Sequence, residues 1–124
     1  MSKTRPKHLE LWNIKFPVPA IVSGLHRISG ALLALAIPFV LYALAGTLSS
    51  AERFDAFRAC IAHPLIKLAL LVVLWAFLHH ACAGIRFLFM DIHKGVDLPT
   101  ARLTAKLVLA VSLVLTAVIG VVAW

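Results

Sequence analysis

The chain has 124 residues, of which 62% are hydrophobic, and a formal net charge of +7 at pH 7. Its apolar residues come in long runs, which excludes a water-soluble domain and indicates one membrane domain over residues 1–124. The basic residues gather at the ends of these runs, so the charge indicates membrane topology and no nucleic-acid partner is expected. The cysteines, Cys60 and Cys82, form no CxxC motif, so neither a disulfide framework nor a zinc site is expected.

The first hydrophobic run is predicted to be a membrane span over residues 21–48, about the length that a tilted helix needs. Residues 1–15 are basic and lack an apolar core, so we expect no cleavable signal peptide. Pro17 and Pro19 are expected to prevent regular helix before about residue 20, because each proline restricts the residue before it. Pro38 predicts a kink in the middle of the span.

Two further hydrophobic runs predict a second span over residues 65–90 and a third over residues 103–124. The segment 49–63 between the first two spans is polar and is expected to be a short loop. The linker 91–102 contains two residues that commonly break helices, Gly95 and Pro99, so the third helix is expected to begin after it.

The distribution of basic residues predicts the orientation in the membrane. Nine of the 12 lysines and arginines lie on the N-terminal side or at the linker after the second span: Lys3, Arg5, Lys7, Lys15, Arg27, Arg86, Lys94, Arg102 and Lys106. Cytoplasmic loops carry such an excess, so the N-terminus is expected in the cytoplasm (or matrix) and the C-terminus outside. The sequence therefore predicts an all-α membrane protein with three transmembrane helices, in a bacterial inner membrane rather than the mitochondrial inner membrane.

Two adjacent histidines lie in the middle of the second span, where ionisable residues are functional candidates. On a helical wheel of about 100° per residue, His80 shares a face with Ala76, Ala83 and Gly84. These small side chains leave a flat slot beside the imidazole, which suits a porphyrin whose iron needs an axial nitrogen ligand. His79 lies about 100° away, on the side of bulky residues, so it is the weaker candidate for the ligand. A hydrogen bond to a neighbouring helix is its simpler role.

The start of the first span holds the second candidate site. Ser23 and Arg27 are four residues apart and share a helix face, where a hydroxyl and a permanent cation suit a quinone carbonyl. Gly24 and Gly30 allow close approach by a backbone or a flat ligand. The simpler interpretation, in which Arg27 reaches for lipid phosphates and the glycines serve helix packing, is slightly favoured by spacing alone.

The two sites are connected by topology. A haem on His80 with its propionates directed inward would bring their charge towards the level of His26 and Arg27. This arrangement makes both residues candidates for propionate contacts.

The combined pattern resembles the cytochrome b556 membrane-anchor family of succinate dehydrogenase (complex II). The resemblance covers the whole chain and is carried by S-x-x-H-R-x-[ST]-G at 23–30, His80-x-x-x-Gly84-Ile85-Arg86, Asp91 and Arg5-Pro6. It implies that His80 is the axial ligand of a haem b shared with a second small membrane-anchor subunit. It also implies that Ser23 and Arg27 bind ubiquinone, and that His26 and Arg27 lie near the propionates. Phe87 departs from the family, which often has histidine there.

The resemblance further implies three partners: a flavoprotein subunit and an iron–sulfur subunit, which oxidise succinate, and the second anchor subunit. The chain has no carboxylate pair, nucleotide-binding loop or cysteine cluster of its own for the succinate chemistry. Three alternatives remain open at this point. They are a fumarate reductase anchor that uses menaquinol, a small proton or ion transport subunit, and a purely structural anchor whose histidines bridge helices.

Overall fold

The computed structural model describes residues 14–124, which form four helices and no strand. They are α1 (Val18–Ser49), α2 (Ala51–Ile61), α3 (Pro64–Asp91) and α4 (Leu98–Ala123). Within this part of the chain, three helices are long and apolar enough to cross a membrane: α1, α3 and α4. The predicted all-α fold with three spans is confirmed, while the orientation of the termini stays a prediction. The basic residues Lys3, Arg5 and Lys7 lie outside the described residues.

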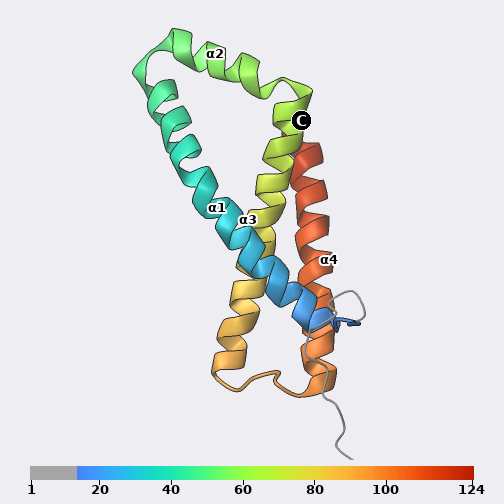
Figure 1. Cartoon of the computed structure of the whole chain (residues 1–124). Coiled ribbons are helices and arrows are strands. Elements are labelled where there is room, and N and C mark those ends of the chain that lie inside the picture. The colour runs from blue at the N-terminus through green and yellow to red at the C-terminus, as the bar shows by residue number, and fades with distance from the viewer. Residues whose placement is uncertain (1–13) are drawn as a thin grey trace, which may run out of the picture.

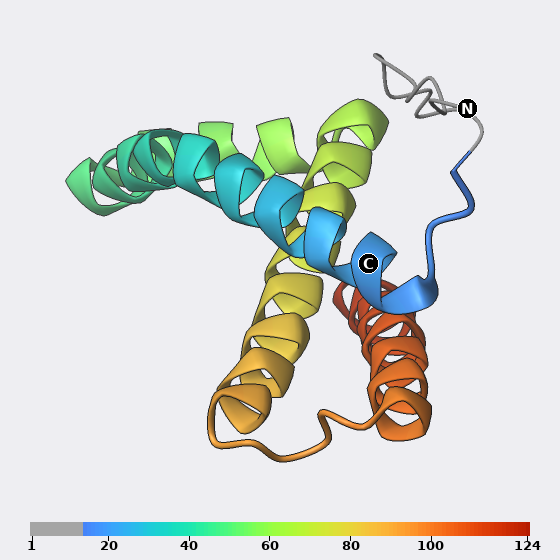
Figure 2. The same cartoon turned by 60° about the horizontal axis from the view of Figure 1, so that its bottom comes forward.

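Helix α1 crosses α3 and α4 at one end of the molecule, here called the converging end, and diverges from them towards the other end; the ends of α3 and α4 joined by the 92–97 loop are themselves apart (Figure 1 and Figure 2). Helices α3 and α4 run side by side, and α1 crosses them near its own N-terminal end (Figure 1). Seen from the converging end, α1 leaves the α3–α4 pair at a wide angle (Figure 2). The short α2 joins the distant ends of α1 and α3 (Figure 1). The converging end therefore holds the contacts among all three spans.

The prolines near two helix starts lie inside the helices, contrary to the prediction. Helix α1 begins at Val18 with Pro19 in its first turn, and α4 begins at Leu98 with Pro99 in the same position. Proline is well tolerated there, because the first N–H groups of a helix have no intrahelical partner. The third span therefore starts five residues before the predicted residue 103. Helix α1 also continues through Pro38 without interruption.

The prediction of a loop over residues 49–63 was wrong, because most of this segment is α2. The side chain of Ser50 caps the helix by accepting a hydrogen bond from the backbone N–H of Arg53 at 3.2 Å. Glu52 in the first turn and Arg58 in the last both match the sign of the helix dipole. Low hydropathy predicted a loop, but the cap and the charges are sufficient to form a short exposed helix.

The first turn of α4 is capped by Asp97, whose carboxylate accepts a hydrogen bond from the backbone N–H of Thr100 at 3.0 Å. Hydrogen bonds from the side chain and the backbone of Thr100 lower the pKa of Asp97 below its ordinary value. The cap therefore strengthens α4 above the ordinary pKa of an aspartate and is lost as the pH falls through the lowered one. This cap defines where the 92–97 loop ends and α4 begins.

The core of the described chain is small and lies at the converging end. Val22 of α1, Ala83 of α3, and Ala105 and Val108 of α4 are buried together. Small side chains on α3 and α4 let the two helices approach closely, as in other membrane helix pairs. Most of the large apolar side chains elsewhere on the spans are exposed, as expected for surfaces that face lipid or partner helices.

The crossing of α1 and α3 depends on the absence of a side chain at Gly30. A Cβ atom built there would lie 2.8 Å from Cε1 of His80 on α3. Real Cβ atoms do not approach other carbon atoms so closely, so a larger residue would push the helices apart or displace the imidazole. A Cβ atom built at Gly24, six residues earlier on α1, would have no neighbouring atom within 4 Å.

We predict that Gly30→Ala destabilises the protein, whereas Gly24→Ala leaves its stability unchanged or raises it. Overpacking of this kind costs about 1–3 kcal/mol, and alanine is a better helix former than glycine. Thermal unfolding of the two variants in the same detergent measures the difference. Equal midpoints for the two variants would show that the close contact at Gly30 does not determine the crossing.

Candidate functional site

The candidate site lies where α1 crosses α3, and its centre is the imidazole of His80. The ring of His80 stacks on that of His26, with centroids 4.1 Å apart and an angle of 11° between the planes. Nδ1 of His80 lies 3.0 Å from the backbone carbonyl oxygen of His26 and 3.3 Å from Oγ of Ser29. Two predicted site residues, His26 and His80, are therefore in direct contact.

These contacts determine which nitrogen of His80 carries the proton. The carbonyl oxygen of His26 can only accept a hydrogen bond, so Nδ1 of His80 is the donor. The hydroxyl of Ser29 donates its own proton to the same carbonyl at 2.9 Å. In the neutral imidazole, Nε2 then keeps a free lone pair. A histidine that binds a metal through one ring nitrogen usually donates the other N–H to such a carbonyl.

The space over Gly84 is bordered by His26 and is not fully open. A Cβ atom at Gly84 would lie 3.7 Å from Nε2 of His26, which is ordinary contact. The ring of Phe87 meets the ring of His26 edge to face, with centroids 5.2 Å apart. His26 thus packs between His80 and Phe87, and it covers a face of the His80 ring rather than its Nε2 edge.

His79 occupies a different environment from its neighbour. Its side chain is fully buried, and neither ring nitrogen has a hydrogen-bond partner within the described part of the chain. It stacks on Trp75, whose Nε1 is also buried without a partner there, with centroids 5.3 Å apart. The ring lies beside the backbone of Val22 on α1, which is the kind of neighbouring-helix contact that was expected, but without the geometry of a full hydrogen bond. Full burial also leaves no room for a planar cofactor at its nitrogens.

The predicted quinone-binding residues, Ser23 and Arg27, lie in the N-terminal part of α1, and Arg27 directly follows His26. Ser23 is partly buried and Arg27 is exposed. No carboxylate within the described residues forms a hydrogen bond with either side chain. Gly24 beside them faces open space. The two side chains are available to a ligand or a partner that approaches the surface of α1.

Two residues without a predicted role, Ser29 and Arg86, lie in polar networks. Ser29 is buried and contacts His80, although it appeared only as a variable position of the motif. Arg86 is 7% exposed and donates hydrogen bonds from α3 to α4, at 3.0 Å from Nε to Oγ1 of Thr104 and 3.2 Å from Nη2 to the carbonyl of Ala101. The spacing of three residues, which puts Ser29 near His26 on α1, could have predicted that Ser29 belongs to the same site.

The donor set favours one kind of metal cofactor. Among residues 14–124, no group of three or more histidine, cysteine, aspartate or glutamate side chains could hold a free metal ion. Cys60 and Cys82 are both free thiols. A single oriented imidazole such as His80 suits a metal that already has most of its ligands, as iron in a porphyrin does.

Comparison with known proteins agrees with this architecture. A family model described as succinate dehydrogenase/fumarate reductase transmembrane subunit matches residues 1–119. The chain is 39% identical over 125 residues to the succinate dehydrogenase cytochrome b556 subunit of Coxiella burnetii, with 100% of both chains covered.

Other relatives with the same description are more distant. The subunit of Rickettsia felis is 30% identical over 117 residues, which covers 94% of this chain and 91% of the relative. That of Paracoccus denitrificans is 29% identical over 108 residues, which covers 87% and 82%. The resemblance deduced from the two motifs is confirmed over essentially the whole chain. The chain belongs to the family of succinate dehydrogenase/fumarate reductase transmembrane subunits.

Proposed function

We propose that this chain is the haem b-containing membrane anchor of a succinate:ubiquinone oxidoreductase and forms part of its quinone-reduction site. The observation that carries the proposal is the orientation of His80, whose Nδ1 is bound to the carbonyl of His26 while Nε2 keeps a lone pair. The cytochrome b556 name of the relatives supports a haem at this place. No other histidine of the described chain combines membrane depth with a ring nitrogen prepared in this way.

His80 would be the axial ligand of the haem through Nε2, and a haem b bound there would supply a one-electron carrier within the membrane. The carbonyl of His26 and the hydroxyl of Ser29 restrict rotation of the His80 ring. The electron-donating hydrogen bond at Nδ1 raises the basicity of Nε2. His26 borders the space over Gly84. In the proposed arrangement, His26 and the neighbouring Arg27 would face the propionates.

Ser23 and Arg27 would bind one carbonyl of ubiquinone. The hydroxyl of Ser23 and the guanidinium of Arg27 donate hydrogen bonds, and the permanent charge of Arg27 stabilises the negative charge that develops on the oxygen during reduction. Oxidation of succinate to fumarate releases two electrons and two protons, and reduction of ubiquinone to ubiquinol consumes the same number. Both Ser23 and Arg27 lie at the end of α1 that is predicted to be cytoplasmic.

The remaining parts of the reaction would come from partner subunits. A flavoprotein subunit would oxidise succinate, and an iron–sulfur subunit would deliver the electrons to the quinone. A second small membrane-anchor subunit would supply the other haem ligand in a shared helical bundle in the bacterial inner membrane. The diverging halves of α1 and α3 border apolar hollows of about 570 Å³ and 550 Å³, which are surfaces that helices of such a subunit or lipid would cover.

The first prediction from the proposed function concerns Arg27. Arg27→Ala in the complete complex is expected to lower succinate:quinone reductase activity about 10- to 100-fold, because a charge-assisted hydrogen bond to the developing oxyanion is lost. Oxidation of succinate by an artificial dye is expected to stay unchanged. Arg53→Ala on the exposed α2 is the matched control and should affect neither assay. Equal loss in both assays for Arg27→Ala would contradict a role at the quinone.

The second prediction separates the two adjacent histidines. His80→Leu is expected to abolish the low-spin absorption band of the reduced complex, because one axial ligand is lost. His79→Leu is expected to keep the band and to preserve or raise thermal stability, because leucine removes two buried ring nitrogens that have no well-formed hydrogen bond, and such burial costs about 1–3 kcal/mol. Loss of the band in His79→Leu but not in His80→Leu would show that His79, and not His80, is the axial ligand.

The third prediction concerns Ser29 as a positioning residue. Ser29→Ala removes one of the two groups at Nδ1 of His80, and loss of such a contact typically weakens metal binding about 10- to 100-fold. We expect weaker haem retention during purification and a shifted haem midpoint potential. Ser29→Thr, which keeps the hydroxyl, is expected to restore both. A potential that stays unchanged in Ser29→Ala would show that the carbonyl of His26 suffices.

A further inference from the structure

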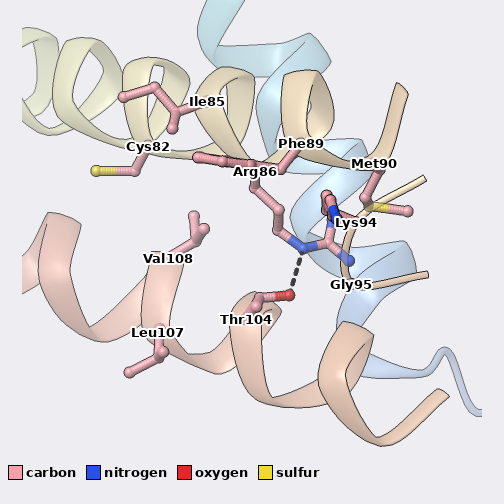
Figure 3. A pocket seen from close by; sticks show the side chains of 10 residues that line it. All are labelled: Cys82, Ile85, Arg86, Phe89, Met90, Lys94, Gly95, Thr104, Leu107 and Val108. Carbon is pink, nitrogen blue, oxygen red and sulfur yellow. Dashed lines mark hydrogen bonds between the residues drawn. The ribbon is translucent and has the colours of Figure 1, made fainter. Parts of the chain in front are cut away.

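A pocket of about 340 Å³ lies between α3 and α4 at the converging end, on a different side of α3 from the His26–His80 contact. Figure 3 shows the side chains that line it. Its walls are mostly apolar, and two cationic side chains occupy one end. The lining residues are Cys82, Ile85, Arg86, Phe89, Met90, Lys94, Gly95, Thr104, Leu107 and Val108.

Arg86 is a buried permanent cation, and both of its hydrogen-bond acceptors in the described part of the chain are neutral. Only 7% of its surface is exposed. One hydrogen bond goes to the hydroxyl of Thr104 (Figure 3) and another to the backbone carbonyl of Ala101. A guanidinium has five N–H donors, so these two bonds leave donors unused. None of the ten lining residues is acidic. A buried charge needs an opposite charge, so this pocket is prepared for an anion.

The position of the two cations limits what the anion can be. Arg86 lies five residues before the end of α3, about 7.5 Å along the helix axis, and Lys94 lies just beyond that end. Both therefore lie at the level where a membrane passes from acyl chains to headgroups. The walls formed by Ile85, Phe89 and Leu107 belong to surfaces that are exposed on the span and would face lipid.

We propose that this pocket binds one anionic phospholipid. Its phosphate lies between the guanidinium of Arg86 and the ammonium of Lys94, and an acyl chain follows the apolar walls. Basic pockets between membrane helices on the cytoplasmic side bind such headgroups, and the positive-inside rule predicts this end of the bundle to be cytoplasmic. The lipid joins α3 to α4 beside the contact between Arg86 and Thr104. The proposal is independent of the haem and quinone assignments, since no residue of those sites lines the pocket.

Binding of phosphatidylglycerol to the delipidated complex in detergent tests the proposal, with native mass spectrometry to count bound lipid and thermal unfolding to measure stabilisation. The complex is expected to bind and be stabilised by phosphatidylglycerol. Phosphatidylcholine with the same acyl chains, and inorganic phosphate at the same concentration, are expected to have little effect.

Lys94→Gln is the main variant, because it lies outside the spans and removes charge without disturbing helix packing. Its apparent Kd for phosphatidylglycerol is expected to rise about fivefold, the contribution of one lysine near a charged lipid. Lys106→Gln removes the same charge from an exposed position of α4 that does not line the pocket, and its Kd is expected to change less than twofold. Leu107→Trp fills an apolar wall without a change of charge and is expected to weaken binding as well.

Wild-type binding in both Lys94→Gln and Leu107→Trp would overturn the proposal and would leave a carboxylate of a partner subunit as the counter-ion of Arg86. Equal weakening in Lys94→Gln and Lys106→Gln would also overturn it, because attraction to the basic end as a whole would then explain the binding. The haem band and dye-linked succinate oxidation report on the other assignments in the same samples. Their loss would concern the proposed function and not the lipid site.

Discussion

The site depends on one hydrogen bond that joins two helices, from Nδ1 of His80 to the backbone carbonyl of His26. In an α-helix this carbonyl already accepts the N–H of the residue four positions later, which here is Gly30. Because Gly30 has no side chain, the imidazole from α3 can approach this carbonyl and shares it with the hydroxyl of Ser29. A Cβ atom at position 30 would lie 2.8 Å from Cε1 of His80, so a larger residue would force the ring or the helix to shift.

This arrangement explains why α3 can carry polar groups on two sides. His80 is turned towards α1, where a carbonyl and a hydroxyl fix its tautomer. Arg86, about 120° away around the helix, is turned towards α4 and is held by Thr104 and Ala101. The small residues Ala76 and Ala83 between them are fully buried and let both neighbouring helices come close. Helix α3 can therefore make one set of polar contacts with α1 and another with α4, because the residues between the two sets are small.

The number and type of the membrane helices could be predicted from the sequence, because hydropathy over about 20 residues is a strong signal. The helix starts and α2 could not be predicted from the same signal, since capping by Ser50 and Asp97 and proline in a first turn depend on backbone hydrogen bonds. Helical periodicity separated the environments of His79 and His80. It could not predict that Ser29 and the carbonyl of His26 meet His80, because the crossing of two helices determines that contact.

The charges inside the spans show that the described chain depends on groups from outside itself. Its acidic residues lie on the short α2 (Glu52 and Asp55), at the C-terminal end of α3 (Asp91) and at the cap of α4 (Asp97), whereas Arg27 and Arg86 lie within the spans. A cation at membrane depth is costly unless an opposite charge neutralises it. Within the described spans, the one acidic residue is Asp91 at the very end of α3, so no carboxylate stands at the depth of Arg27 or Arg86. The proposed ligands share the property that this imbalance requires, because haem propionates, a reduced quinone oxygen and a lipid phosphate are all anions that could neutralise these cations.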